Sequence, residues 1–77
     1  MKALVELVAR SLVDHPQAVV VHEVGGAHTT VLELRVAPED LGKIIGRGGR
    51  VIKAIRILAR AAATRRGTRV TVEIIRP

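Results

Sequence analysis

The chain contains no cysteine and no phenylalanine, tyrosine or tryptophan among its 77 residues. Without cysteine there are no disulfides, thiolate nucleophiles or cysteine-based zinc sites, and nothing indicates an oxidising compartment. Without aromatic side chains the chain cannot stack nucleobases on aromatic rings, which is how many single-strand binders hold their ligands. Any nucleic-acid site must therefore depend on charge, backbone groups and aliphatic side chains.

Long apolar runs are also missing. Glu6 and Arg10 interrupt the apolar residues near the N-terminus, a pattern that a secretory signal core does not tolerate. No apolar run approaches the roughly 20 residues that a membrane-spanning helix needs. The hydrophobic content of 48% is nevertheless ample for a packed core. These features predict a soluble, cytoplasmic protein of one domain, residues 1–77, without a membrane partner.

Residues for metal binding or catalysis do not gather in the sequence. His15, His22 and His28 stand alone, without ligand spacing, so no metal and no cofactor is expected. The glycine patterns of nucleotide hydrolases and dinucleotide-binding folds are absent. Because no carboxylate lies in the glycine-rich region described below, a reactive acid–base pair is not expected there. The sequence does not predict an enzyme.

Positive charge is concentrated in one part of the chain. The formal charge is +6, but residues 41–72 contain nine basic residues and no acid, whereas the remainder contains four basic residues and all seven acids. The two parts therefore have charges of +9 and −3. This separation indicates a polyanionic partner. The alternative is an arginine-rich face that serves only for solvation.

The first half predicts a helix followed by a hairpin. Residues 2–14 are amphipathic, and the helix is expected to end at Asp14-His15-Pro16. The segments 18–24 and 29–36 are rich in β-branched residues and flank the turn sequence GGAH. The residues expected to be buried in this half are Leu4, Val5, Val8, Leu12, Leu32, Leu34 and Val36.

The second half predicts two helices and a strand. A short helix should begin at Pro38, with Leu41, Ile44 and Ile45 on its buried side. A long helix should run from after Gly49 to about Arg66, and Gly67 fits the residue that ends it. Its expected buried arc contains Val51, Ile52, Ile55, Leu58, Ala59 and Ala62. Residues 68–77 predict a last strand with Val70, Val72 and Ile74 inward, parallel to the second strand.

The turn Gly46-Arg47-Gly48-Gly49 lies between the two expected helices. Glycine adopts positive φ and allows close approach of backbone. The first amides of the long helix have no intrahelical acceptor and lie at the positive end of the helix dipole, which favours an anion. Arg50 and Lys53 add charge nearby. The sequence therefore predicts a phosphate-binding turn.

The motif IIGRGGRVI in residues 44–52 resembles the I-G-x-x-G-x-x-I signature of KH domains. The element order α-β-β-α-α-β resembles the bacterial type II version, and the whole chain resembles the small stand-alone bacterial KH proteins of the KhpA type. The resemblance implies an α+β, two-layer fold with a three-stranded mixed sheet and helices on one face. It also implies binding of single-stranded RNA through a loop that clamps about four nucleotides, in a chaperone or regulator. Pairing with a second copy or with a larger KH-containing protein is implied as well.

The residues expected to bind RNA are Gly42, Lys43, Ile45, Gly46, Arg47, Gly48, Gly49, Arg50 and Lys53. Ile44 or Ile45 should line an aliphatic groove in which Gly42 leaves room for a base. Along the long helix, Arg56, Arg60, Arg65 and Arg66 either contact RNA or solvate the surface, and Ile57 is an exposed residue suited to a dimer contact. The alternative function is an assembly subunit, such as a ribosome-associated factor, whose KH surface mainly contacts protein.

Overall fold

Three strands form one mixed sheet in the computed structural model, which describes residues 1–76. β1 (Val20–Gly25) pairs with β2 (Thr30–Arg35) antiparallel through the expected hairpin, in which the Gly26 amide donates to the Thr29 carbonyl at 2.9 Å. β3 (Val70–Ile74) pairs with β2 in parallel, with Leu32 opposite Val72. The sheet order β1-β2-β3 leaves β1 and β3 as the edges.

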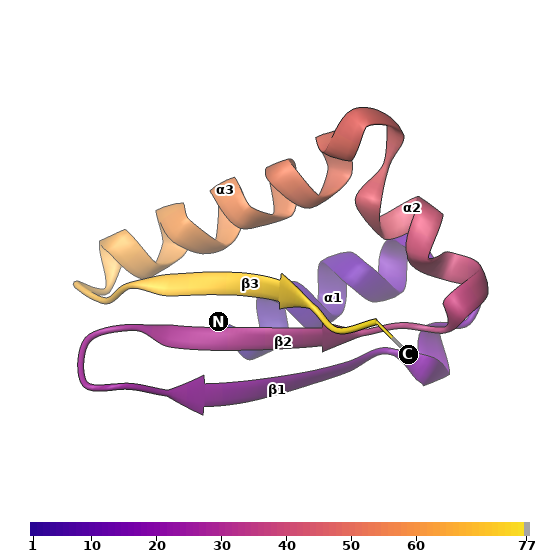
Figure 1. The fold of residues 1–77 in the computed structure, drawn as a ribbon. Helices are drawn as coiled ribbons and strands as arrows, with labels where there is room; N and C mark the ends of the chain where they lie inside the picture. The colour runs from indigo at the N-terminus through magenta and orange to yellow at the C-terminus, as the bar shows by residue number, and fades with distance from the viewer. Residues whose placement is uncertain (77) are drawn as a thin grey trace.

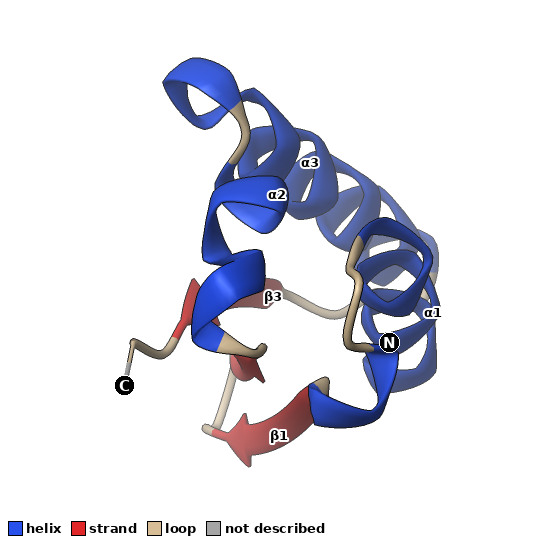
Figure 2. Cartoon of the chain, turned by 90° about the vertical axis from the view of Figure 1, so that its right-hand side faces the viewer, coloured by secondary structure: helices blue, strands red, loops and turns tan. Residues whose placement is uncertain are grey.

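The helices cover one face of this sheet. α1 (Lys2–Leu12) and α3 (Arg50–Arg65) lie on that face (Figures 1 and 2). α2 (Leu41–Ile45) packs against both helices at one end of the layer. Single 3₁₀ turns η1 (Pro16–Ala18), η2 (Pro38–Asp40) and η3 (Arg47–Gly49) precede β1, α2 and α3. The order α-β-β-α-α-β, the mixed sheet and the two layers are therefore confirmed. No helix in residues 1–76 has the length and apolar character to cross a membrane.

The core lies between the two layers. Alternation along the strands places Val21, Leu32, Leu34 and Val72 against the helices, each at most 2% exposed. From the helices, Val5, Ala9, Ile44, Ile52, Ile55, Ala59 and Ala63 complete the contact. Three alanines in this set allow α1 and α3 to approach the sheet closely.

The structure corrects several details of the sequence prediction. α1 ends at Leu12 rather than near residue 14, because Val13 is extended and the amides of Asp14 and His15 donate to the carboxylate of Asp40. Leu12 and Leu58, both expected to be buried, are 40% and 52% exposed. The buried stripe of α3 follows Ile52, Ile55, Ala59 and Ala63, which is narrower than expected and leaves Leu58 outside it.

The end of α3 agrees with the prediction. Gly67 has φ +71°, and its amide donates to the Thr64 carbonyl at 3.0 Å, which ends the helix and turns the chain toward β3. Because β3 then returns beside β2, the last turns of α3 lie next to the edge of the sheet (Figure 1).

Candidate nucleic-acid interface

Local hydrogen bonds fix the glycine turn between α2 and α3. The Gly46 amide donates to the Gly42 carbonyl at 2.8 Å and ends α2, and the Gly49 amide donates to the Gly46 carbonyl at 3.1 Å. Gly48 and Gly49 both lie in the left-handed region, with φ of +63° and +76°. The turn is therefore compact, and α3 begins directly after it.

Gly46 is the most constrained residue of the turn. Its φ of +74° and ψ of +169° fall in a region that only glycine occupies readily. A Cβ atom placed on Gly46 would clash with a γ-methyl group of Val51 and would lie 2.8 Å from the Cβ and 2.9 Å from the backbone nitrogen of the same residue. Because two of these contacts involve atoms fixed to the backbone, no side-chain rotation could relieve them. Glycine is required here to let the turn approach the first residues of α3.

The start of α3 is open to a ligand. Gly49 occupies the N-cap position and has no side chain to accept hydrogen bonds from the first turn, and no acid lies in that turn. The Arg50 amide donates to the Arg47 carbonyl of η3, whereas the following amides of the first turn have no intrahelical acceptors, and the helix dipole favours negative charge beside them. The geometry therefore provides the donors for an anion.

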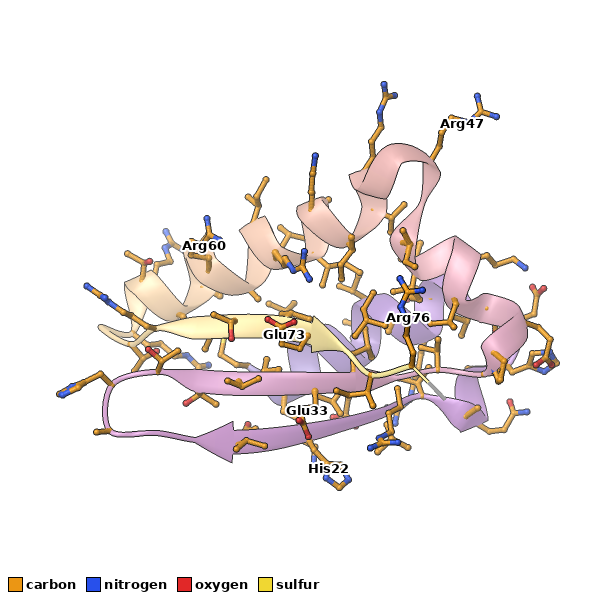
Figure 3. The ribbon with its side chains drawn as sticks, in the orientation of Figure 1. His22, Glu33, Arg47, Arg60, Glu73 and Arg76 are labelled. Carbon is orange, nitrogen blue, oxygen red and sulfur yellow. The ribbon has the colours of Figure 1, made fainter. Side chains whose placement is uncertain are left out.

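Three cationic side chains lie in the turn and in the first turn of α3. Arg47, Arg50 and Lys53 are exposed, and within residues 1–76 none of them forms an ion pair. Arg47 projects away from the body of the protein at the outermost point of the turn (Figure 3). Their charge is thus uncompensated and available to an anion at the turn.

The residues of α2 that were expected near the site differ in their exposure to solvent. Gly42 is exposed and Ile45 is half-buried, so both remain accessible beside the turn. Ile44, in contrast, is 0% exposed and belongs to the core. It cannot line a groove, and that part of the sequence interpretation is wrong.

Lys43 is occupied by carboxylates. Its ammonium lies 2.8 Å from a carboxylate oxygen of Asp14 and 3.8 Å from one of Asp40. The hydrogen bond from Lys43, reinforced by its charge, lowers the pKa of Asp14, and the same hydrogen bond raises the pKa of Lys43. The structure therefore places Lys43 in an ion pair, rather than with the uncompensated cations of the turn.

Asp40 anchors the base of α2. Its side chain is fully buried and accepts hydrogen bonds from the amides of Asp14 at 3.2 Å and His15 at 3.0 Å. In the sequence, Asp40 lies at the start of the expected short helix, where a carboxylate is favoured by the helix dipole. Its actual partners are about 25 residues distant in the chain, which no local pattern reveals.

A groove between α3 and β3 was not expected from the sequence. It consists of two adjoining hollows of about 200 Å³ and about 380 Å³, which share Arg60, Val70 and Thr71. Arg56 belongs to the smaller hollow, where its Nε donates to the Val72 carbonyl at 3.0 Å on the outer edge of β3. Arg60 lies on the helix side and Glu73 on the strand side (Figure 3).

No cluster of three histidine, aspartate or glutamate side chains suited to a metal ion occurs in the described residues 1–76. The turn offers amides and guanidinium groups that suit the binding of an anion, and the groove adds guanidinium groups and hydroxyls beside the carboxylate of Glu73.

The fold and the glycine turn between two helices define a KH domain of type II. A protein-family model described as "KhpA/KhpB, KH domain" matches residues 2–74, and the chain belongs to this family, which is not enzymatic. The chain is 55% identical to the RNA-binding protein KhpA of Clostridium perfringens and 56% identical to that of Clostridium acetobutylicum, each over 97% of this chain and all of the relative. KhpA of Aquifex aeolicus is 45% identical over 97% of this chain and 95% of the relative.

A solved structure shares the fold. The crystal structure of Era from Aquifex aeolicus matches 95% of this chain with a TM-score of 0.66 and 24% identity. This chain corresponds to only 28% of that protein, so the likeness concerns the fold of one part of Era.

Proposed function

We propose that residues 1–77 act as one KH domain that binds single-stranded RNA at the glycine turn. The observation that carries this proposal is the combination of uncapped amides at the start of α3 with three unpaired cations, Arg47, Arg50 and Lys53. Both features attract phosphate, and the phosphate backbone supplies much of the affinity in protein–nucleic acid complexes. The names of the KhpA relatives, which are RNA-binding proteins, support the same conclusion.

The bound segment at the turn comprises about four nucleotides, the length that KH loops clamp. From the turn the strand follows the groove between α3 and β3. Glu73 lines this groove together with Arg56 and Arg60, so the groove offers hydrogen-bond acceptors and donors to the bases of the strand. Because the bases must be splayed to enter, unpaired RNA should bind better than duplex.

The cellular role is that of a cytoplasmic RNA chaperone or regulator.

A pair of substitutions tests the turn directly. Replacing Arg47 and Gly48 together by aspartate removes one cation and adds two anions where phosphates should lie. The fold should survive, because the space around Gly48 is open and aspartate tolerates positive φ better than most residues. Binding of labelled single-stranded RNA should be lost while the circular dichroism spectrum is unchanged.

The matched control replaces Lys2 and Ala3 by aspartate, which changes the net charge by the same amount. Both residues are exposed in the first turn of α1, where aspartate also suits the helix dipole. The control should retain most of the binding. Equal losses in both variants would indicate a general effect of net charge and would contradict a site at the turn.

A second candidate function, an assembly subunit that contacts protein, is favoured by exposed apolar side chains on the helices. Leu7, Ile57 and Leu58 are 65%, 62% and 52% exposed. Such side chains suit a contact with a second copy or with a larger KH-containing protein. Sedimentation of the wild type and of the Ile57→Glu, Leu58→Glu variant tests this contact, and RNA binding by the same variant shows whether the two functions are separable.

A further inference from the structure

The outer edge of β1 is open to a further strand. In Figure 1 this edge faces away from α1, α2 and α3. Natural edge strands are commonly protected from other strands by lysine, proline or a bulge. β1 contains neither lysine nor proline, and its pairing with β2 continues without interruption from Val20 to Gly25. At the opposite edge of the sheet, in contrast, Nε of Arg56 on α3 donates to the Val72 carbonyl of β3.

The sheet register identifies the backbone groups that lie at this edge. The Leu34 carbonyl accepts a hydrogen bond from the Ile75 amide at 2.9 Å, so Leu34 directs its backbone groups toward β3. Val21, its antiparallel partner on β1, therefore directs its own amide and carbonyl away from β2. Because this direction alternates along a strand, Glu23 and Gly25 do the same. Within residues 1–76, no side chain forms a hydrogen bond with the backbone of these three residues of β1.

The side chains of β1 are complementary to those of a second β1. Val20, His22 and Val24 lie on the face of the sheet that the helices leave open, and the two valines are 42% and 50% exposed. In an antiparallel pair centred on His22, Val20 lies opposite Val24 of the second copy. Val21 then lies opposite Glu23 of the second copy, and each such pair exchanges two hydrogen bonds. A pair centred on Glu23 would instead oppose two carboxylates, which is unfavourable.

We propose that β1 pairs with the β1 of a second copy, antiparallel and centred on His22, so that the two sheets become one. A pair of strands of six residues is smaller than a standard interface of about 1,600 Å², so the contact is weak and depends on concentration. It differs from the contact through Ile57 and Leu58 considered above, because it uses no helix. The pair carries two glycine turns on one sheet. The inference goes beyond the proposed function and does not depend on it, since no residue of the turn or of the groove takes part.

The test exchanges charge at the centre of the pair. His22 and its counterpart form a pair without mutual backbone hydrogen bonds, whose Cα atoms lie about 4.5 Å apart. His22→Lys and His22→Glu should each weaken self-association roughly fivefold, because each opposes two like charges. An equal mixture of the two variants should associate at least as well as the wild type. Sedimentation equilibrium over about a hundredfold range of concentration measures this, because a contact of this size is weak.

The matched controls are Thr71→Lys and Thr71→Glu, which place the same charges at an exposed residue on the same face of the sheet but on β3. They should leave self-association within about twofold, since strand-to-strand charge effects act between neighbours. Glu33 lies opposite His22 within each copy, so circular dichroism checks that the His22 variants fold. Equal losses in the Thr71 and His22 variants, or a mixture that associates no better than its components, would overturn the pairing. Self-association that Ile57→Glu, Leu58→Glu abolishes and His22 variants leave unchanged would overturn it as well.

Amide hydrogen exchange of the wild type locates the contact. The amides of Val21 and Glu23 should be protected at high protein concentration and exchange freely at low concentration. The His22 amide, which faces β2, should be protected at both concentrations. A wild type that stays monomeric, with free exchange at Val21 and Glu23 throughout, would leave the edge to a strand of another protein and overturn pairing with a second copy. Loss of RNA binding would refute the proposed function alone, because the two contacts share no residue.

Discussion

Replacement of Gly46 by alanine should destabilise the domain far more than the same change at Gly48. The backbone conformation of Gly46 costs a residue with a side chain about 1–3 kcal/mol. The added Cβ also meets Val51 at 2.8 and 2.9 Å, and forcing a methyl group into such a space costs a further ~1–3 kcal/mol. The two penalties sum to about 2–6 kcal/mol, and we expect a loss of at least about 3 kcal/mol. A chain of this size has a free energy of unfolding of roughly 4–12 kcal/mol in all.

Gly48 provides the internal comparison. Its φ is also positive, at +63°, but a Cβ there would have open space around it. Its replacement by alanine should cost only about 1–2 kcal/mol, the penalty of the left-handed conformation. With a dependence of about 1 kcal/mol per molar urea, the unfolding midpoint should fall by about 3 M for Gly46→Ala and by about 1–2 M for Gly48→Ala.

Urea unfolding followed by far-ultraviolet circular dichroism measures both variants, since the chain has no aromatic residue to serve as a fluorescent probe. Val51→Ala added to Gly46→Ala gives a further check. It removes the γ-methyl groups of Val51 but leaves its Cβ and backbone nitrogen in place, so it should rescue little of the loss. Equal midpoints for the two glycine variants, or full rescue by Val51→Ala, would refute this account of the turn.

Two further predictions concern charge. Because the pKa of Asp14 is lowered from 3.8 in the folded protein, its ion pair with Lys43 stabilises the fold above pH 3.8, and this contribution is lost as the pH falls through the folded value. Asp14→Asn should therefore lose less stability on acidification than the wild type, as measured by urea midpoints across the acid range, and an unchanged pH profile would refute the role of the pair. For a tetranucleotide at the turn, a plot of log K against log salt should have a slope of about −2 to −3, and a slope near zero would exclude phosphate contacts.

Local sequence patterns were sufficient to predict the element order and the turn. Alternation in β2 and the glycines at residues 46 and 67 are features of a few adjacent residues, and the structure confirms what they predicted for the fold. Features that depend on the packing of distant segments could not be predicted from these local patterns. Leu58 is exposed because neither the sheet nor α1 covers its side of α3, and a helical wheel does not show where a neighbouring layer ends.

In the candidate site, too, some residues could be predicted from local sequence and others could not. The cations around the turn follow directly from the motif, whereas the ion pair of Lys43 requires Asp14 from a segment 29 residues away. The groove between α3 and β3 exists only once β3 lies beside β2, so its threonines had no recognisable spacing in the sequence. Arg69, which precedes β3, was recognised only as one of many positive charges.

The buried carboxylate of Asp40 has a consequence for the kinetics of binding. It ties the segment after α1 to the start of α2, and the close contact of Gly46 with Val51 ties the end of α2 to α3. The turn is therefore part of a rigid frame and needs no closing movement when a ligand arrives. Association with RNA should then be a single step whose observed rate rises linearly with RNA concentration, without a plateau. Differences between RNAs would be expressed mainly in how long each remains bound.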